Sequence, residues 1–113
     1  MARVTAVRGE IWLADLGMAQ KIRPVLVLSV AYKENERAVV TFIGRTTSLR
    51  NSEYEIAHVA PRFDAGAFDV QGISTVPDAY LIRRIAICDN ATLEKVESAL
   101  LKWLGIQPPL DKG

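Results

Sequence analysis

The sequence has few of the residues on which common kinds of functional site depend. Its 113 residues include a single cysteine, Cys88, and a single histidine, His58. One cysteine excludes an internal disulfide and a thiolate-rich zinc site, and one histidine excludes a two-histidine acid–base pair within the chain. The carboxylates show no spacing typical of metal-binding helices or loops, and there is no glycine-rich phosphate motif. We therefore expect no metal and no cofactor.

The sequence also lacks a large excess of charge of one sign and lacks long apolar runs. Lys and Arg number 14 and Asp and Glu 13, so any nucleic-acid site must be a local patch. No apolar run approaches the ~18 residues of a membrane span, and the N-terminus lacks the apolar core of a signal peptide. We expect a cytoplasmic protein without a membrane partner. The length predicts a single domain, residues 1–106, followed by a tail, residues 107–113.

The pattern of apolar residues predicts strands over most of the chain. Alternating or continuously apolar segments rich in β-branched residues are typical of strands. Residues 23–30, RPVLVLSV, indicate a central strand covered on both faces, and residues 45–52, RTTSLRNS, indicate an exposed polar loop. The other predicted strands are 9–16, 38–44, 53–59 and 69–76, and 79–87 is either a strand or a short bend.

The pattern changes to a helical period near the C-terminus. Apolar residues recur there at helical spacing, with Asp89 or Asn90 able to cap the start and Gly105 able to close the end. The fold class is therefore mainly β: a small antiparallel barrel or strongly coiled sheet of about five to seven strands, with one C-terminal α-helix. The members of the apolar stripe are Leu93, Val96, Leu100, Trp103 and Leu104.

Arginine, hydroxyl and amide side chains are the remaining candidates for chemistry. Arg23 precedes Pro24, which favours an extended backbone and holds the arginine in a defined direction at the start of an apolar strand. If the strand before the 45–52 loop is its neighbour, donors from both segments converge at one end of the sheet, as in a phosphate clamp. The alternative is a solvated strand end and a solvated turn. The donors are Lys21, Arg23, Arg45, Thr46, Thr47, Ser48 and Arg50.

Several segments together resemble the PemK/MazF toxins of type II toxin–antitoxin systems. They are RGEIWLADLG, KIRPVLVLSV, AVVTFIGRTTSLR, FDVQGISTVP and LEKVESALLKWLGI, and the likeness spans roughly residues 8 to 106. The resemblance implies an SH3-like, CcdB-like β-barrel that forms a homodimer. It also implies a metal-independent endoribonuclease that cleaves single-stranded RNA at selected sequences and inhibits growth. A cognate antitoxin protein would cover the RNA site.

The resemblance assigns roles to individual residues. Arg23 occupies the place of the family's catalytic arginine. The family's threonine would fall at Gly44, so Thr47 or Thr46 must supply the catalytic hydroxyl here. For RNA binding we expect base contacts from Asp69 and Gln71 and stacking by Trp12, whose alternative is packing in the barrel or a dimer. Lys21, Arg45, Ser48 and Arg50 complete the expected RNA-binding set.

Two other functions fit parts of the same sequence. CcdB-like gyrase poisons share the barrel and end in a Trp-Gly-Ile tip, which KWLGI echoes with Leu104 inserted. A catalytically inactive barrel that only binds RNA or protein is favoured by Gly44, because the usual threonine is missing there. Three results distinguish these functions. RNA cleavage indicates the endoribonuclease, inhibition of DNA supercoiling indicates the gyrase poison, and binding without cleavage indicates the inactive barrel.

Overall fold

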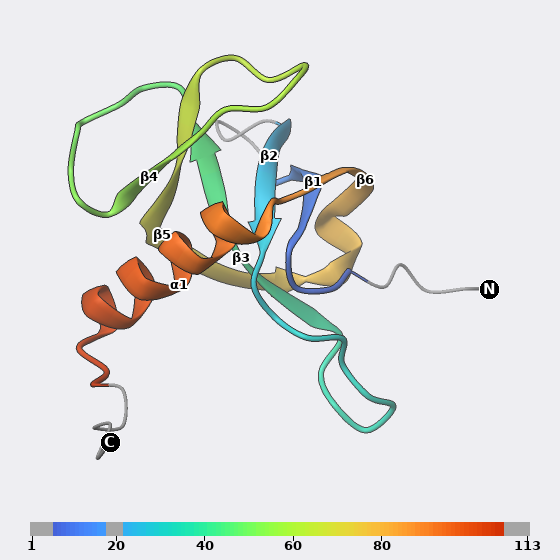
Figure 1. Ribbon diagram of the computed structural model, residues 1–113. Helices are drawn as coiled ribbons and strands as arrows, with labels where there is room; N and C mark the ends of the chain where they lie inside the picture. The colour runs from blue at the N-terminus through green and yellow to red at the C-terminus, as the bar shows by residue number, and fades with distance from the viewer. Residues whose placement is uncertain (1–5, 18–21, 108–113) are drawn as a thin grey trace.

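The computed structural model describes residues 6–17 and 22–107, and within them six strands form one antiparallel sheet (Figure 1). The strand order is β4-β5-β3-β2-β1-β6. The mainly β class with a C-terminal helix is confirmed, although the sheet is open, with β4 and β6 at its edges. The elements are β1 (Glu10–Asp15), β2 (Ile22–Val27), β3 (Val39–Thr46), β4 (Glu55–His58), β5 (Gly66–Pro77), a 3₁₀ turn (Asp78–Tyr80), β6 (Leu81–Ile87) and α1 (Asn90–Leu104).

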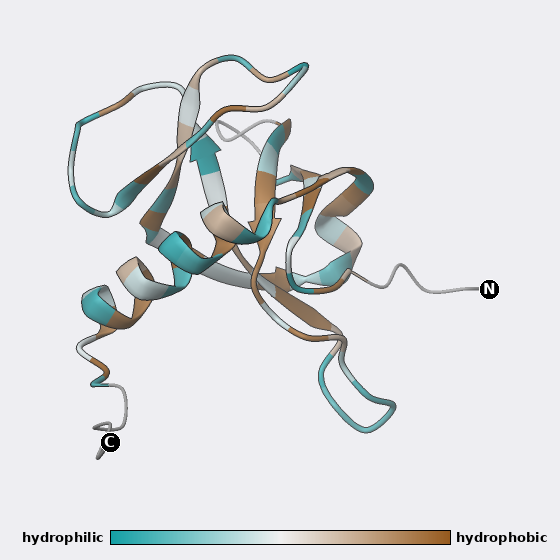
Figure 2. Cartoon of the chain, in the orientation of Figure 1, coloured by the Kyte–Doolittle hydropathy of each residue, from teal (hydrophilic) through white to brown (hydrophobic). Residues whose placement is uncertain are grey.

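Apolar side chains cover both faces of the central strands. Figure 2 shows hydrophobic residues along these strands. In β2, Leu26 points to one face, whereas Val25 and Val27 point to the other, and all three are fully buried. The prediction of a central strand covered on both faces is thus confirmed. Successive side chains of a strand alternate between faces, so the two apolar clusters lie on opposite sides of the sheet.

Helix α1 covers one of these faces and packs on β4 and β5. Its buried residues are Val96 and Ala99, which join the cluster that contains Leu26. The predicted caps are confirmed. The Asp89 carboxylate accepts from the Thr92 backbone N–H at 2.9 Å, and Gly105 has a left-handed backbone with φ of 70°.

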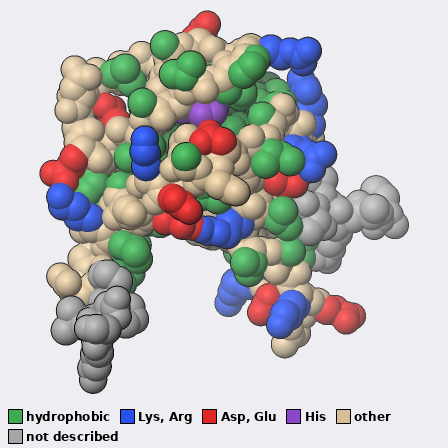
Figure 3. All heavy atoms as spheres, viewed as in Figure 1, with side chains coloured by type: hydrophobic (Ala, Val, Ile, Leu, Met, Phe, Trp, Pro, Cys, Tyr) green, Lys and Arg blue, Asp and Glu red, His purple; other side chains and the backbone are tan. Residues whose placement is uncertain are grey.

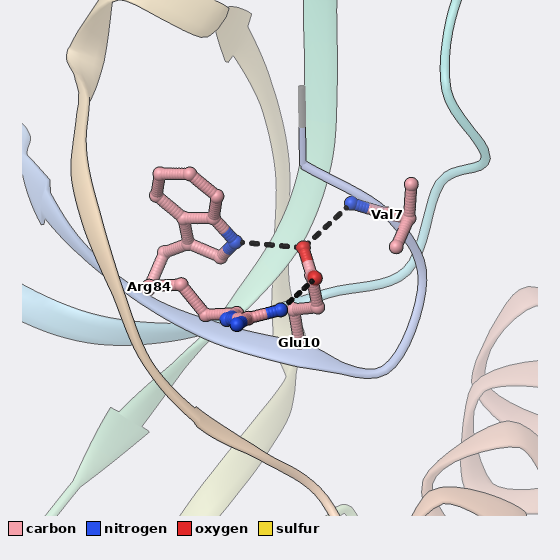
Figure 4. A network of polar contacts seen from close by, with 4 residues as sticks. Val7, Glu10 and Arg84 are labelled. Atoms are coloured by element: carbon pink, nitrogen blue, oxygen red, sulfur yellow. Dashed lines mark hydrogen bonds and ion pairs between the residues drawn. The ribbon is translucent and has the colours of Figure 1, made fainter. Parts of the chain in front are cut away.

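A polar network joins β1 to β6 and to the segment before β1 (Figure 4). Glu10 Oε1 accepts from the Val7 backbone N–H and from Trp12 Nε1, each at 3.0 Å, and Oε2 accepts from Arg84 at 3.1 Å. Burial alone would raise the pKa of Glu10, but these hydrogen bonds outweigh it and lower the pKa. Trp12 itself is buried among apolar side chains and is only 8% exposed.

Most strand boundaries differ from the sequence-based prediction by one to three residues, and the end of β3 matters most for the site. Strand β3 runs two residues further than predicted, so Arg45 and Thr46 belong to a strand and the exposed loop begins at Thr47. The extension follows from pairing with β5, in which Arg45 lies opposite Phe68 and Thr46 opposite Ala67. Of the two alternatives for residues 79–87, the structure has strand β6 over most of that segment.

Candidate nucleic-acid interface

The start of β2 and the end of β3 meet at one end of the sheet. The two strands are antiparallel neighbours with Val25 opposite Gly44, which brings Arg23 beside the last residues of β3. The Arg23 guanidinium donates to the Arg45 carbonyl oxygen at 3.1 Å. The predicted convergence of the Arg23 strand with the RTTSLR segment is therefore confirmed.

Arg23 faces an open groove on the side of the sheet away from α1. By the period of a strand, Arg23 and Val25 share a face of β2, and Phe42, Gly44 and Thr46 share a face of β3. These five residues line a cavity of about 740 Å³. The other lining residues are Leu16, Ser48, Arg50, Ser52, Glu55, Asp69, Gln71, Gly72, Ser74, Val76 and Tyr80.

An irregularity in β5 supplies most of the polar wall of this groove. Phe42 pairs with Ser74 and Gly44 pairs with Asp69, so β5 has several extra residues opposite this short piece of β3. Such a bulge bends the strand and redirects its side chains. An Asp69 carboxylate oxygen accepts from the Gln71 backbone N–H at 3.1 Å, which fixes the turn. Asp69 and Gln71, the two predicted base contacts, consequently lie in the groove with Arg23.

A second cavity, of about 470 Å³, lies on the other side of the Arg23–Thr46 pair. Arg23, Thr46 and Ser48 line both cavities, whereas Thr47 lines only the second. Its remaining walls come from the strand ends and from the loop between β4 and β5. They are Pro24, Arg45, Arg62, Phe63 and Asp64.

Arg45 is buried rather than exposed, which corrects its expected place in a solvated loop. Its side chain is 6% exposed, and Nε donates to His58 Nδ1 at 2.8 Å. Its Nη2 donates to the carbonyl oxygens of His58 and Asp64, at 2.9 and 2.6 Å. Gly66 leaves room for this arrangement, because a Cβ there would lie 2.6 Å from the Thr46 carbonyl oxygen and 2.8 Å from Arg45 Nη1.

The contact with Arg45 requires an uncharged His58. A protonated imidazole has no acceptor nitrogen and would repel the guanidinium. Burial, and then the Arg45 cation, lower the pKa of His58, while Asp89 acts in the opposite direction. Burial also lowers the pKa of Arg45, which still remains protonated at neutral pH. His58 also contacts the rings of Phe63 and Phe68, at centroid distances of 5.2 and 4.7 Å.

Other residues proposed from the sequence lie away from the cavities or outside the described ranges. Trp12 lines neither cavity and packs in the apolar cluster with Val25 and Val27, which agrees with its packing alternative. The RNA contact expected of Lys21 falls outside the described residues. Ser48 and Arg50 lie in the groove, as a shared site requires.

Cys88 is buried, and burial followed by the Asp89 charge raises the pKa of its thiol to about 11. A thiol with that pKa is almost entirely protonated at neutral pH and is a poor nucleophile. Within residues 6–17 and 22–107, no group of three or more His, Cys, Asp or Glu side chains is placed to hold a metal ion. Over the same ranges, no helix is long and apolar enough to cross a membrane.

Sequence reasoning missed the loop between β4 and β5 and the carboxylate of Glu55. The sequence assigns no functional role to Arg62, Phe63 and Asp64, yet they form one wall of the second cavity. Glu55 lines the groove and accepts from the Arg50 backbone N–H at 2.8 Å. The alternating pattern of residues 53–59 places Glu55 on a strand but gives no sign that the strand borders a site.

Comparison with known proteins matches almost the whole chain to one family. A sequence model of that family, described as PemK-like, MazF-like toxin of type II toxin–antitoxin system, covers residues 7–104.

Solved structures named as endoribonucleases or as MazF toxins share the fold of this chain. An endoribonuclease in complex with its cognate antitoxin, from a mycobacterial species, has a TM-score of 0.78 at 25% identity, over 92% of this chain and 99% of that one. A MazE–MazF complex from Deinococcus radiodurans (Form-III) has a TM-score of 0.77 at 17% identity, over 92% and 100%. The Mycobacterium tuberculosis toxin MazF-mt6 has 0.72 at 22%, over 87% and 98%. The chain therefore belongs to the PemK-like, MazF-like toxins of type II toxin–antitoxin systems.

Proposed function

We propose that the protein is an endoribonuclease that cleaves single-stranded RNA without a metal ion and thereby inhibits growth. The observation that carries the proposal is the placement of Arg23 and Thr46 between two cavities that both residues line. A strand of RNA that crosses this pair would present a phosphate to the guanidinium and to the hydroxyl together. The family membership and the endoribonuclease named among the structural neighbours support the same activity.

The reaction requires stabilisation of negative charge on a phosphate. The ribose 2′-oxygen forms a bond to the adjacent phosphorus and loses its proton to solvent. The bond from phosphorus to the 5′-oxygen breaks, and that oxygen takes up a proton. The products are a 2′,3′-cyclic phosphate and a 5′-hydroxyl. Arg23 stays protonated, so we assign it to electrostatic stabilisation by fixed donors rather than to general-base catalysis.

Thr46 is better placed than Thr47 to donate a second hydrogen bond to the phosphate. Thr46 is held in β3 and lines both cavities, whereas Thr47 is exposed and lines only the second. The Thr46 hydroxyl oxygen accepts from the Ser48 backbone N–H at 3.0 Å, which orients it. Its proton points to the Ser48 carbonyl oxygen over a long 3.4 Å, and a phosphate oxygen would replace that weak acceptor. A group that is fixed before the reaction contributes more than a mobile one.

The groove offers donors and acceptors suited to base edges. Sequence-selective RNA binding usually reads the exposed edges of unstacked bases. Asp69 and Glu55 supply acceptors for exocyclic amino groups, and Gln71, Ser48 and Arg50 supply donors. We therefore assign sequence preference to this groove.

In solution we expect a homodimer of about twice the 12.5 kDa chain. A dimer would add a second copy of the RTTSLR segment, residues 45–50, and strengthen RNA binding despite the net charge of +1 per chain. We also expect a cognate antitoxin, as in the complexes among the structural neighbours, to block the RNA site. Light scattering on the purified toxin tests the first expectation, and a stable monomer at micromolar concentration would contradict it.

Incubation of the purified protein, free of antitoxin, with a long RNA in EDTA tests the activity. We expect discrete cuts whose ends carry a 2′,3′-cyclic phosphate and a 5′-hydroxyl. Ends mapped by sequencing also give the preferred sequence. Binding without cuts would favour an inactive RNA-binding barrel, and inhibition of DNA supercoiling with intact RNA would favour a gyrase poison.

A further inference from the structure

We propose that the second cavity binds a phosphate of the RNA strand flanking the cleavage point, on the side opposite to the bases read in the groove. Arg62 would be the cation that holds this phosphate, and Phe63 would supply an apolar surface for the attached nucleoside. This inference rests on the proposed function.

The balance of charge differs between the two cavities. Among the described residues, the groove is lined by two cations, Arg23 and Arg50, and by two carboxylates, Glu55 and Asp69. Within residues 6–17 and 22–107, the second cavity is lined by three cations, Arg23, Arg45 and Arg62, and by one carboxylate, Asp64. An anionic phosphate is attracted to the second cavity more than to the groove, whereas uncharged base edges suit the mixed groove.

Arg62 is not needed to hold the loop in place. Its side chain is exposed, and it makes no hydrogen bond or ion pair with any part of the chain that the structure describes. The loop is instead fixed by Arg45, which donates to the carbonyl oxygens of His58 and Asp64. The guanidinium of Arg62 therefore stays available to a ligand.

The backbone of Arg62 supports the same interpretation. Its φ of 71° lies in the left-handed region, which arginine seldom adopts and which Gly and Asn tolerate better. Side-chain contacts within the described residues do not account for an arginine at this position. Unfavourable conformations of this kind tend to gather at functional sites.

Phe63 is held at the cavity by neighbours on two sides. The Arg45 guanidinium carbon lies 4.9 Å from the ring centroid, and the His58 ring meets it nearly edge-on at 5.2 Å. The ring is half-buried and still lines the cavity. A fixed aromatic surface next to a cation suits a nucleotide, because the base or ribose can pack while the phosphate pairs.

The test combines variants of Arg62 with RNA substrates of different length. Once the cut site is mapped, three oligonucleotides are compared: one extended on both sides and one truncated near the cut on each side. Arg62→Asn removes the cation with a residue that tolerates the left-handed backbone. Arg62→Lys keeps the charge, and Arg37→Asn removes an exposed arginine that lines neither cavity.

We expect Arg62→Asn to lower kcat/KM on the extended substrate about ten-fold, the loss typical of one charge-assisted hydrogen bond. For the wild type, one truncation should cause a similar loss, and the variant should be insensitive to that truncation. The salt dependence of RNA binding should decrease by about 0.7 in logarithmic slope, as for one lost phosphate contact. Arg62→Lys should restore the slope, and Arg37→Asn should match the wild type.

Equal sensitivity of wild type and Arg62→Asn to both truncations, with an unchanged salt slope, would overturn the inference while leaving the nuclease activity in place. If the wild type makes no cuts, the proposed function fails first, so the two failures are distinguishable. Circular dichroism of each variant confirms the fold. If Arg62→Asn does not fold, Arg62→Gly takes its place, since glycine adopts the left-handed backbone conformation without steric penalty.

Discussion

Replacement of Arg23 by alanine is expected to lower kcat for RNA cleavage by about 100- to 1000-fold, the loss typical when one donor to a developing negative charge is removed. The fold should persist. Arg23 is half-buried at a strand end, and its one hydrogen bond to a described residue goes to the Arg45 carbonyl oxygen. Single-turnover cleavage rates and thermal melting of the same preparations measure both effects.

Arg23→Lys should lower kcat for RNA cleavage almost as much, because an ammonium presents a point charge instead of a planar pair of donors. Arg37→Ala is the matched control, since this exposed arginine lies outside both cavities. If Arg23→Ala cleaved RNA and arrested growth as fully as the wild type, the catalytic role assigned to Arg23 would be wrong.

The same assay separates the two threonines. Thr46→Val should lower the rate, and Thr47→Val should leave it nearly unchanged. A Cβ at Gly44 would meet no atom within 4 Å, so there is open space where a threonine side chain would begin. If the reaction needs a hydroxyl in the groove, the double variant Thr46→Val, Gly44→Thr should recover activity. An equal effect of both single variants would contradict the assignment to Thr46.

Local patterns were sufficient to predict most elements and the position of Arg23. The apolar run after Pro24 shows a buried strand without any knowledge of its neighbours, and the start and end of α1 follow from Asp89 and Gly105. These features depend on residues close in sequence, where periodicity, proline geometry and helix caps act.

Features that depend on pairing between distant residues were not predictable in the same way. Arg45 belongs to a polar segment by composition, but its neighbours in space are His58 and two carbonyl oxygens that satisfy its donors. The bulge in β5 that brings Asp69 and Gln71 into the groove arises from register with β3. Trp12 lies on the more polar side of its own strand by sequence, yet both faces of that strand are covered.

Charge on the face shown in Figure 3 agrees with the composition. Lys and Arg side chains are mixed with Asp and Glu over the lower part of that face, and several basic side chains gather at its upper right edge. The excess of arginine over carboxylate at the second cavity is therefore a local feature. A net charge of +1 does not reveal such a site, because it averages over all surfaces.

Replacement of Arg45 by methionine should cause the largest loss of stability among the variants considered. Methionine has a similar length but leaves His58 Nδ1 and the carbonyl oxygens of His58 and Asp64 without their donor. Buried polar groups without partners cost about 1–3 kcal/mol each, so we expect a loss of about 3 kcal/mol or more. In a domain of this size that lowers Tm by roughly 10–20 °C, measurable by calorimetry.

The same pair predicts a pH dependence of stability. In the folded protein burial and Arg45 lower the pKa of His58, so the unfolded chain takes up a proton more readily below the ordinary histidine pKa of about 6.5. The stability that neutral His58 contributes is thus fully present above pH ~6.5 and is lost as pH falls towards the lowered folded pKa. Carboxylates such as Glu10, whose pKa is also lowered, change the stability of the fold only at more acidic pH.

Arg45→Met removes the cation that faces His58, while Asp89, which raises the pKa of His58, remains. The variant should therefore lose less stability than the wild type between pH 7.5 and 5.5, although it is less stable throughout. Tm measured at several pH values for both proteins gives the comparison, with Arg37→Met as the control for loss of an exposed arginine. Parallel curves for wild type and Arg45→Met would show that Arg45 does not hold His58 neutral, and a stable Arg45→Met protein would show that its three acceptors find other donors.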